Sequence, residues 1–435
     1  MSITFITTLA LFGVFFILLF VGVPISVSIA VATFAAALFF LPMDSSLLVT
    51  SQQIITGIDS FVLVALVFFM LAGSIMNNGG IAQRLINLAK LIGGRMSGSL
   101  AHTNVIGNML FGSISGSSIA SAATMGKIMG PQQKKEGYDP AYSAAVNIAS
   151  APTGQIIPPS GIPIIYSLLS GGTSIGALFL AGYMPGILMA LLVLIVAYII
   201  AKRNKYPVSG SVQWGEGVKI VLDAVPSLLL IVVVIGGIAG GVFTATEGAA
   251  VAVLYALILS LIYRGLAFSD IPKILKETVV FSGMILLLVG ASTAMSWVMT
   301  YAQIPQTITN ALLALSDNYY VIMLIIAFLL LLVGIFMDVA PALLVFTPIL
   351  FPVATQLGVD PVHFGMIMTM GLAIGVTTPP IGTVLFIGSS VSGVSIEKIV
   401  KPLVIFYIPL VVGLLLVTFI PEISLWLPKT LGVME

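Results

Sequence analysis

Apolar stretches long enough to cross a membrane recur along the whole chain, separated by short polar or charged segments. The run 220–241 contains a single charged side chain, and the run 321–336 contains none. A hydrocarbon layer needs about 20 consecutive apolar residues in helical form. The pattern therefore predicts an all-α polytopic membrane protein, whose first spans lie at about 4–20, 24–41 and 58–77.

The composition supports a membrane protein. Hydrophobic residues make up 59% of the chain and charged residues 7%, whereas soluble domains carry about a quarter charged residues. A water-soluble fold of this length could not hide so much apolar side chain. The net charge of +1 gives no surface for nucleic acid, and the absence of cysteine excludes disulfides and thiolate chemistry.

Basic residues gather in four groups, which the positive-inside bias places in the cytoplasm. The groups are Arg84, Lys90 and Arg95; Lys134 and Lys135; Lys202, Arg203 and Lys205; and Arg264, Lys273 and Lys276. With these loops inside, the path has ten spans, and both termini are periplasmic. The small, polar run 112–118 then predicts the tip of a re-entrant hairpin within 97–131, because non-helical backbone at that depth needs protein or water around it.

The second half of the chain repeats the first at a constant shift of 221 residues. This shift carries the Gly-Tyr-Asp-Pro motif at 137–140 onto Gly-Val-Asp-Pro at 358–361, and Gly154 onto Gly375. It also carries the Pro-Pro pair at 158–159 onto the pair at 379–380. Basic loops fall opposite non-basic ones, so the two repeats are predicted to have inverted orientations.

The repeat divides the chain into two halves, 1–216 and 217–435. The first half is predicted to contain scaffold spans 1–78, an amphipathic arm 80–95, a transport part 97–180 and a scaffold span 183–202. The second half is predicted to contain scaffold spans 217–300, an arm 301–317, a transport part 319–398 and a scaffold span 402–428. Inverted repeats with broken helices are typical of alternating-access secondary transporters; a channel or a structural duplication is the alternative.

Each repeat has two interruptions, a hairpin tip and a broken span. They lie at 115–118 and 147–160 in the first repeat, and at 337–341 and 375–382 in the second. Double proline ends a helix, and the freed carbonyls can bind a dehydrated Na⁺ while half-helix N-termini face an anionic substrate. Each tip with its break therefore predicts one Na⁺ site. The alternative is that these small residues only allow close helix packing.

The interruptions supply the candidate site residues. The Na⁺ sites are assigned to Ser115, Ser117, Ser118, Asn147 and Gly154 in the first repeat, and to Asp338, Ala340, Gly375, Thr377, Thr378 and Gly382 in the second. The substrate site, between the two pairs, is assigned to Ser117, Thr153, Pro159, Ser160, Asp338 and Pro380.

Asp338 is the most informative of the titratable residues, since an ionisable group at a membrane-embedded tip is a functional candidate. It could ligate a cation or cap the following helix. Lys127 is expected to extend to the interface, and Glu247 to complete a capping box. His102 and His363 are expected at the interface. The sequence shows no catalytic constellation, which argues against an intramembrane enzyme.

These motifs resemble the large membrane subunit of TRAP (tripartite ATP-independent periplasmic) transporters, the DctM-like family. The likeness rests on Gly-Ser-Ser at 116–118, Ile-Pro-Pro-Ser at 157–160 and Thr-Pro-Pro-Ile-Gly at 378–382, and it covers almost the whole chain. The chain departs from the family at Ser121, where an acid is common, and at Ala245, where proline is usual.

The resemblance implies an elevator-type transporter that imports an organic acid, such as sialic acid or a C4-dicarboxylate, in symport with Na⁺. It also implies a small membrane subunit of four helices, a periplasmic substrate-binding protein and the inner membrane of a prokaryote. A stand-alone Na⁺-coupled dicarboxylate or anion transporter of similar architecture is the alternative function.

Overall fold

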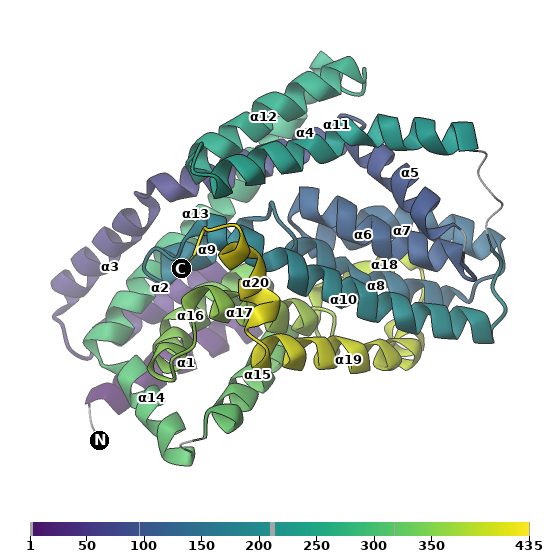
Figure 1. The fold of residues 1–435 in the computed structure, drawn as a ribbon. Helices are drawn as coiled ribbons and strands as arrows, with labels where there is room; N and C mark the ends of the chain where they lie inside the picture. Colours follow the sequence, from purple (N-terminus) through teal and green to yellow (C-terminus); the bar gives the residue numbers. More distant parts are fainter. Residues whose placement is uncertain (1–2, 95, 209–213, 317, 435) are drawn as a thin grey trace.

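The computed structural model describes residues 3–94, 96–208, 214–316 and 318–434, and these form helices and no strand (Figure 1). Arg95 of the first basic group lies outside the described residues. The first half contains α1 Ile3–Val21, α2 Ile25–Ala37, α3 Met43–Ile58, α4 Phe61–Asn78, α5 Ile81–Gly93, α6 Ser99–Ser115, α7 Ser118–Lys135, α8 Pro140–Ile156, α9 Gly161–Leu169 and α10 Ile175–Arg203. The second half contains α11 Trp214–Ala239, α12 Ala245–Ile262, the 3-10 turn η1 Phe268–Asp270, α13 Ile271–Tyr301, α14 Ile304–Leu315, α15 Tyr319–Phe336, α16 Val339–Gln356, α17 Pro361–Gly375, α18 Thr383–Ser392, α19 Ile396–Phe419 and α20 Glu422–Thr430.

The spans agree with a polytopic membrane protein. Within the described ranges, 9 helices are long and apolar enough to cross a membrane. The structure differs from the predicted path at 24–41, where α2 has only 13 residues and reaches about 20 Å at 1.5 Å per residue. The sequence also missed α3, because Ser, Thr and Gln lower its hydropathy. This helix packs on α13, where a Cβ on Gly290 would lie 2.7 Å from the Ile54 carbonyl oxygen.

The repeat extends to the helix boundaries. A shift of 221 residues carries both ends of α7 onto the ends of α16, since Ser118 meets Val339 and Lys135 meets Gln356. The same shift carries the first residue of α8 onto that of α17, and the first residue of α10 onto that of α19. The constant spacing of Gly and Pro residues thus corresponds to a constant spacing of the helices that they bound.

Two hairpins lie at the predicted tips. Helices α6 and α7 are joined by Gly116 and Ser117, and α15 and α16 by Met337 and Asp338. Gly116 has a φ of +61°, a conformation that favours glycine, and this allows the tight reversal. Ser117 then caps α7 by accepting a hydrogen bond from the Ala120 amide at 3.3 Å. The predicted interruptions are therefore real turns of the backbone.

In each repeat the hairpin crosses the broken span at a pair of glycines. A Cβ on Gly112 of α6 would lie 2.6 Å from the Gly154 Cα of α8. A Cβ on Gly375 of α17 would lie 2.5 Å from the Gly334 Cα of α15. Such distances exclude any side chain at the crossings, so the glycines bring each hairpin against its own break, as close packing of membrane helices requires.

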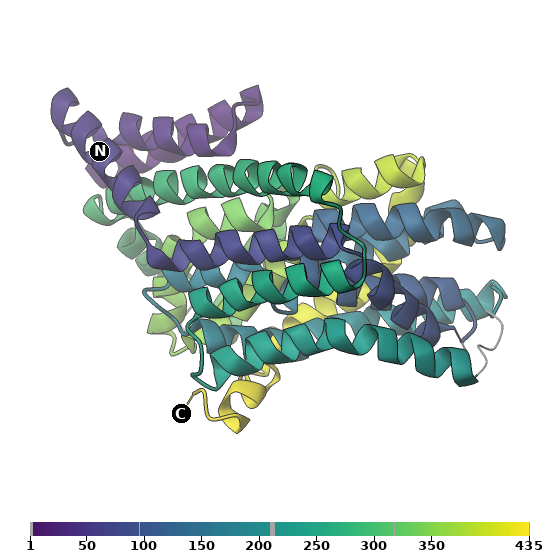
Figure 2. The ribbon, with the colours of Figure 1, turned by 90° about the horizontal axis from the view of Figure 1, so that it is seen from above.

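The two chain ends lie toward one side of the molecule. Figures 1 and 2 show both labelled ends toward one side, and the adjoining ends of α10 and α11 toward the other. The predicted path places both termini on the same face and the α10–α11 loop on the opposite face. The assignment of the first face to the periplasm stays a prediction.

The two histidines are buried in the helix packing rather than exposed at an interface. His102 and His363 are 0% and 1% exposed, respectively. The His102 Nε2 atom lies 3.0 Å from the Ser97 carbonyl oxygen, and the His363 Nε2 atom lies 3.4 Å from the Thr418 carbonyl oxygen. The sequence missed this burial because both residues lie near helix starts, where lateral packing is invisible in the sequence.

Candidate functional site

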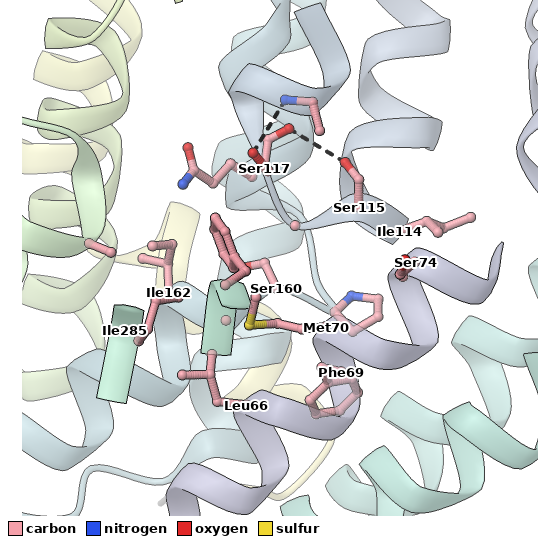
Figure 3. A pocket seen from close by; sticks show the side chains of 18 of the residues that line it. Leu66, Phe69, Met70, Ser74, Ile114, Ser115, Ser117, Ser160, Ile162 and Ile285 are labelled. Carbon is pink, nitrogen blue, oxygen red and sulfur yellow. Dashed lines mark hydrogen bonds between the residues drawn. The ribbon is translucent and has the colours of Figure 1, made fainter. Parts of the chain in front are cut away.

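One cavity lies where the two repeats meet. It has a volume of about 330 Å³, and its walls come from the first hairpin tip, the break between α8 and α9, the second hairpin tip, α4 and α13. Figure 3 shows the small polar side chains of the first tip and of Ser160 facing apolar side chains such as Phe69 and Met70. A site with one polar wall and one apolar wall suits a small polar solute.

The first tip forms its own hydrogen bonds at the edge of this cavity. The Ser115 hydroxyl donates to the Ser117 carbonyl at 3.4 Å, and the Ser117 hydroxyl oxygen accepts from the Ala120 amide, as the dashed lines in Figure 3 show. Because Ser117 and Ala120 both line the cavity, the N-terminus of α7 borders it. The positive end of that helix dipole therefore lies at the cavity wall.

The break of the first repeat supplies the adjoining wall. The Ser118 hydroxyl donates to the Gln155 Oε1 atom at 2.9 Å, and Gln155 lines the cavity. The Ser160 hydroxyl also belongs to this wall, and it is buried without a hydrogen-bond partner among the described residues. Thr153 does not line the cavity, and its hydroxyl donates to the Ser150 carbonyl at 2.6 Å.

Asp338 of the second tip reaches the same cavity. It occupies the N-cap position of α16, but its side chain makes no capping hydrogen bond. Its Oδ1 atom is buried and has no hydrogen-bond partner within the described part of the chain. The capping role that the sequence left open is therefore not realised. A buried carboxylate oxygen in this state calls for a proton or a cation.

The break of the second repeat lies behind its tip rather than in the cavity wall. The Thr377 and Thr378 hydroxyls both donate to the Ile374 carbonyl, at 2.7 and 3.2 Å. The Tyr407 hydroxyl of α19 donates to the Thr377 carbonyl at 2.7 Å. A Cβ on Gly382 would lie 2.6 Å from the Val376 carbonyl oxygen, so backbone oxygens crowd around this glycine.

The predicted residues divide into three sets. Those that line the cavity are Ser115, Ser117, Pro159, Ser160, Asp338 and Ala340. Those that belong to the tips or breaks but do not line it are Ser118, Thr153, Gly154, Gly375, Thr377, Thr378, Pro380 and Gly382. Asn147 lies elsewhere, within α8, with its amide nitrogen donating to the Ala122 carbonyl at 2.8 Å. This differs from its predicted place beside the first tip, because Asn147 precedes Gly154 by about two helical turns.

The family follows from comparison with known proteins. Residues 12–423 match the family described as Tripartite ATP-independent periplasmic transporter, DctM component. This chain is a TRAP transporter large permease. It is therefore a multi-pass membrane transporter subunit and not an enzyme.

Three known proteins are similar to this TRAP permease in sequence or in fold. The chain is 52% identical to YgiK of Salmonella typhimurium, over 97% of each chain. It is 37% identical to the sialic acid TRAP transporter large permease protein SiaM of Vibrio cholerae, over 95% of this chain and 96% of that one. The YdaH transporter of Alcanivorax borkumensis shares its fold, with a TM-score of 0.61 at 15% identity over 87% of this chain and 90% of the other.

Sequence reasoning missed the wall that α4 and α13 contribute to this TRAP permease. Phe69, Met70 and Asn77 come from α4, and Glu277 and Thr278 from α13. The sequence did contain one sign of this wall, which was the acid Glu277 inside the long helix that includes Lys273. The Glu277 carboxylate lies 4.0 Å from the Lys273 ammonium group and its side chain is 52% exposed.

The charge of the cavity is one-sided. Its charged lining residues are the acids Asp338 and Glu277, and no lysine or arginine is among the lining residues that the structure describes. Glu277 is exposed and paired with Lys273, so the buried Asp338 carboxylate is the group that would repel a carboxylate substrate if it were ionised. Binding of an anion here is therefore favoured when a proton or a cation neutralises Asp338.

Proposed function

We propose that this TRAP permease imports an organic acid in symport with Na⁺. The observation that carries the proposal is the cavity shared by both hairpin tips. Among the described residues, the Asp338 Oδ1 atom at this cavity has no hydrogen-bond partner, and no lining residue is basic. Sodium ions at the two tips would neutralise Asp338 and attract the carboxylate of the substrate. Binding of ion and substrate would then be coupled, as symport requires.

The proposed Na⁺ sites lie at the two glycine crossings, where each tip meets its break. Ser115, Ser117, Ser118 and Gly154 belong to the first, and Asp338, Ala340, Gly375, Thr377, Thr378 and Gly382 to the second. Broken membrane helices offer backbone carbonyls to small cations in other transporters. Ser160, Pro159 and Ser117 would contact the substrate, since they line the shared cavity. Asn147 is not included, because it lies away from both tips.

The cavity also supports an elevator movement. It extends from the hairpin tips to Asn77 at the end of α4 and to Glu277 near the start of α13. The positive-inside bias places the neighbouring Lys273 and Lys276 in the cytoplasm. We therefore infer that the cavity opens inward. The transport parts 97–180 and 319–398 would carry it across the scaffold to reach the other side.

The partners follow from the family. The TRAP system is tripartite by name, so we expect a small four-helix membrane subunit beside the scaffold spans and a periplasmic protein that delivers the substrate. The membrane would be the inner membrane of a prokaryote. The likeness to SiaM supports a sialic acid as the first substrate to test, and a C4-dicarboxylate as the second.

The test is uptake into proteoliposomes that contain the permease and its small subunit. Radiolabelled sialic acid and succinate are supplied with candidate binding proteins, with and without an inward Na⁺ gradient. We expect uptake of one acid that needs both the gradient and a binding protein. Uptake without any binding protein would favour the stand-alone transporter. Flux that ignores the Na⁺ gradient would contradict symport and favour a channel.

A further inference from the structure

A second cavity lies apart from the first, between α7, α8 and α18. Its volume is about 490 Å³, larger than the 330 Å³ of the cavity at the tips. Its walls join the first repeat, through α7 and α8, to the second repeat, through α18. The second cavity therefore offers space of the same order as the first.

Two lysines give this cavity the opposite charge to the first. Lys127 and Lys134 both line it, and no acidic residue does so among the described lining residues. They are seven residues apart on α7, which places them two turns apart on one face. Neither ammonium group lies within 4.0 Å of a carboxylate in the part of the chain that the structure describes. Both lysine side chains are exposed, so two cations without a carboxylate partner border one open cavity.

Buried hydrogen-bond donors complete the wall. The Ser143 hydroxyl is buried and has no hydrogen-bond partner among residues 3–94, 96–208, 214–316 and 318–434. The Asn104 side chain is 1% exposed, and no hydrogen bond from its amide nitrogen is found within those ranges. Buried polar groups are nearly always satisfied by protein or water. Donors left free at a cavity wall therefore point to an acceptor as ligand.

The amides behind this wall are held in place. The Asn108 amide nitrogen donates to the Oδ1 atoms of Asn104 and Asn147, at 3.1 and 3.0 Å. Asn108 in turn accepts from the Ser121 hydroxyl through its own Oδ1. The Asn104 oxygen receives a hydrogen bond, and the Asn147 amide nitrogen already donates to the Ala122 carbonyl, so the Asn104 amide nitrogen is the amide donor that this wall offers the cavity in a fixed position. Preorganised donors of this kind suit an anion.

We propose that this second cavity binds a small organic carboxylate, without Na⁺. Lys127 and Lys134 supply the charge, and Ser143 and Asn104 donate to the oxygens that enter deepest. The choice of a carboxylate rests on the proposed function; the donor set itself would accept the phosphate of a lipid headgroup as well. A bound anion would join α7 to α18, and so link the two repeats on the side of the basic loop at Lys134.

The experiment measures protection of lysines from acetylation. The purified permease, in lipid-free detergent and Na⁺-free potassium buffer, is treated with acetic anhydride at increasing potassium succinate, with potassium chloride holding the ionic strength constant. Mass spectrometry then reports each lysine. We expect succinate to protect Lys127 and Lys134, but not Lys135. Lys135 is the matched control, because it follows Lys134 on α7 and does not line the cavity.

The variant Ser143→Ala tests the buried donor. Loss of one hydrogen bond to a charged group should raise the succinate concentration for half-protection by about tenfold, while Lys135→Gln should leave it unchanged. Equal protection of all three lysines, or none at Lys127 and Lys134, would overturn the proposal. If phosphatidylglycerol nanodiscs protected Lys127 and Lys134 from acetylation while succinate did not, the cavity would bind a lipid headgroup, and the proposal would also be overturned. The assay involves no transport, so failure of Na⁺-driven uptake with intact protection would reject the proposed function alone.

Discussion

At the scale of single residues, the informative contrast is between two aspartates at helix starts. Asp360 caps α17 by accepting from the Val362 and His363 amides, at 2.8 and 3.2 Å. Asp338 begins α16 without such a bond and leaves Oδ1 buried. The same side chain at the same helical position thus stabilises a helix in one case and faces a cavity in the other.

The first prediction exchanges each aspartate for asparagine. Asp338→Asn removes the charge that a cation would neutralise, and it should lower uptake in proteoliposomes about tenfold, since an interaction with a charged group is worth about 1.5–3 kcal/mol. Asp338→Glu should recover little, because one more methylene displaces the oxygens. Asp360→Asn is the matched control and should transport normally, because Asn caps as well as Asp. Normal uptake by Asp338→Asn would contradict the cation-coupled role.

The second prediction concerns the hydroxyls of the proposed Na⁺ sites. Ser117→Ala and Thr378→Ala should raise the Na⁺ concentration for half-maximal uptake, because each removes an oxygen from a tip or break. Ser117→Ala also removes a helix cap, worth about 1 kcal/mol. Ser174→Ala removes a similar cap, to which the Ala177 amide donates at 3.2 Å, away from the tips. Ser174→Ala is the control and should keep the Na⁺ dependence of the parent. If Ser117→Ala and Thr378→Ala also keep it, the Ser117 and Thr378 hydroxyls serve packing alone.

At the scale of elements, the repeated device is a hairpin crossing a broken helix at paired glycines. Gly112 meets Gly154 in one repeat, and Gly334 meets Gly375 in the other. The close approach leaves no room for a side chain. It holds each tip near the end of a helix, where the last carbonyls have no intrahelical amide to accept from. Both proposed ion sites depend on this contact, since hydroxyls and carbonyls meet there.

The third prediction tests the first crossing. Gly154→Ala would place a Cβ against the Gly112 Cα and should lower the free energy of unfolding by about 1–3 kcal/mol, the usual cost of overpacking. The measurement is thermal unfolding in detergent. Gly283→Ala of α13 is the control, because no heavy atom lies within 4 Å of its added Cβ. Equal melting temperatures for Gly154→Ala and the parent would show that the helices separate easily at this point.

At the scale of the whole molecule, the two repeats build two cavities of opposite charge. The cavity at the tips carries Asp338 and Glu277, and the cavity beside α18 carries Lys127 and Lys134. Both lie between elements of different repeats. The cavity beside α18 lies wholly within the transport parts 97–180 and 319–398, whereas the cavity at the tips also has walls from α4 and α13. The proposed elevator movement would therefore change the cavity at the tips and leave the cavity beside α18 intact.

The fourth prediction is the orientation of the chain. In this cysteine-free background, Ile3→Cys and Leu431→Cys should react with a membrane-impermeant maleimide added to the periplasmic side. Asn204→Cys, between α10 and α11, should react only after the membrane is opened. All three positions are exposed in the structure. Labelling of Leu431→Cys only from the cytoplasm would reverse the path that the basic loops predict.

The sequence by itself determined the features that depend on local chemistry. Apolar length against the thickness of a bilayer predicted the spans, and Gly and Pro, which control the backbone directly, located the hairpin tips and the breaks within 147–160 and 375–382. The structure narrows the breaks to 157–160 and 376–382, because α8 continues to Ile156 and α17 to Gly375. The constant spacing between equivalent residues predicted the repeat, and the structure extends the same spacing to the helix boundaries. The sequence could also place Asp338 at a tip, because the tip and the acid are adjacent in the chain.

Only the tertiary structure decided which atoms meet. The rotation of each helix about its axis depends on distant partners, such as the glycine crossings, and no local pattern records it. For this reason Thr377 and Thr378 donate to a carbonyl instead of lining the cavity, α4 and α13 form an unforeseen wall, and Asn147 faces a second cavity. Backbone conformation depends on residues that are adjacent in the sequence, whereas the composition of a site depends on packing between residues that are far apart in the sequence.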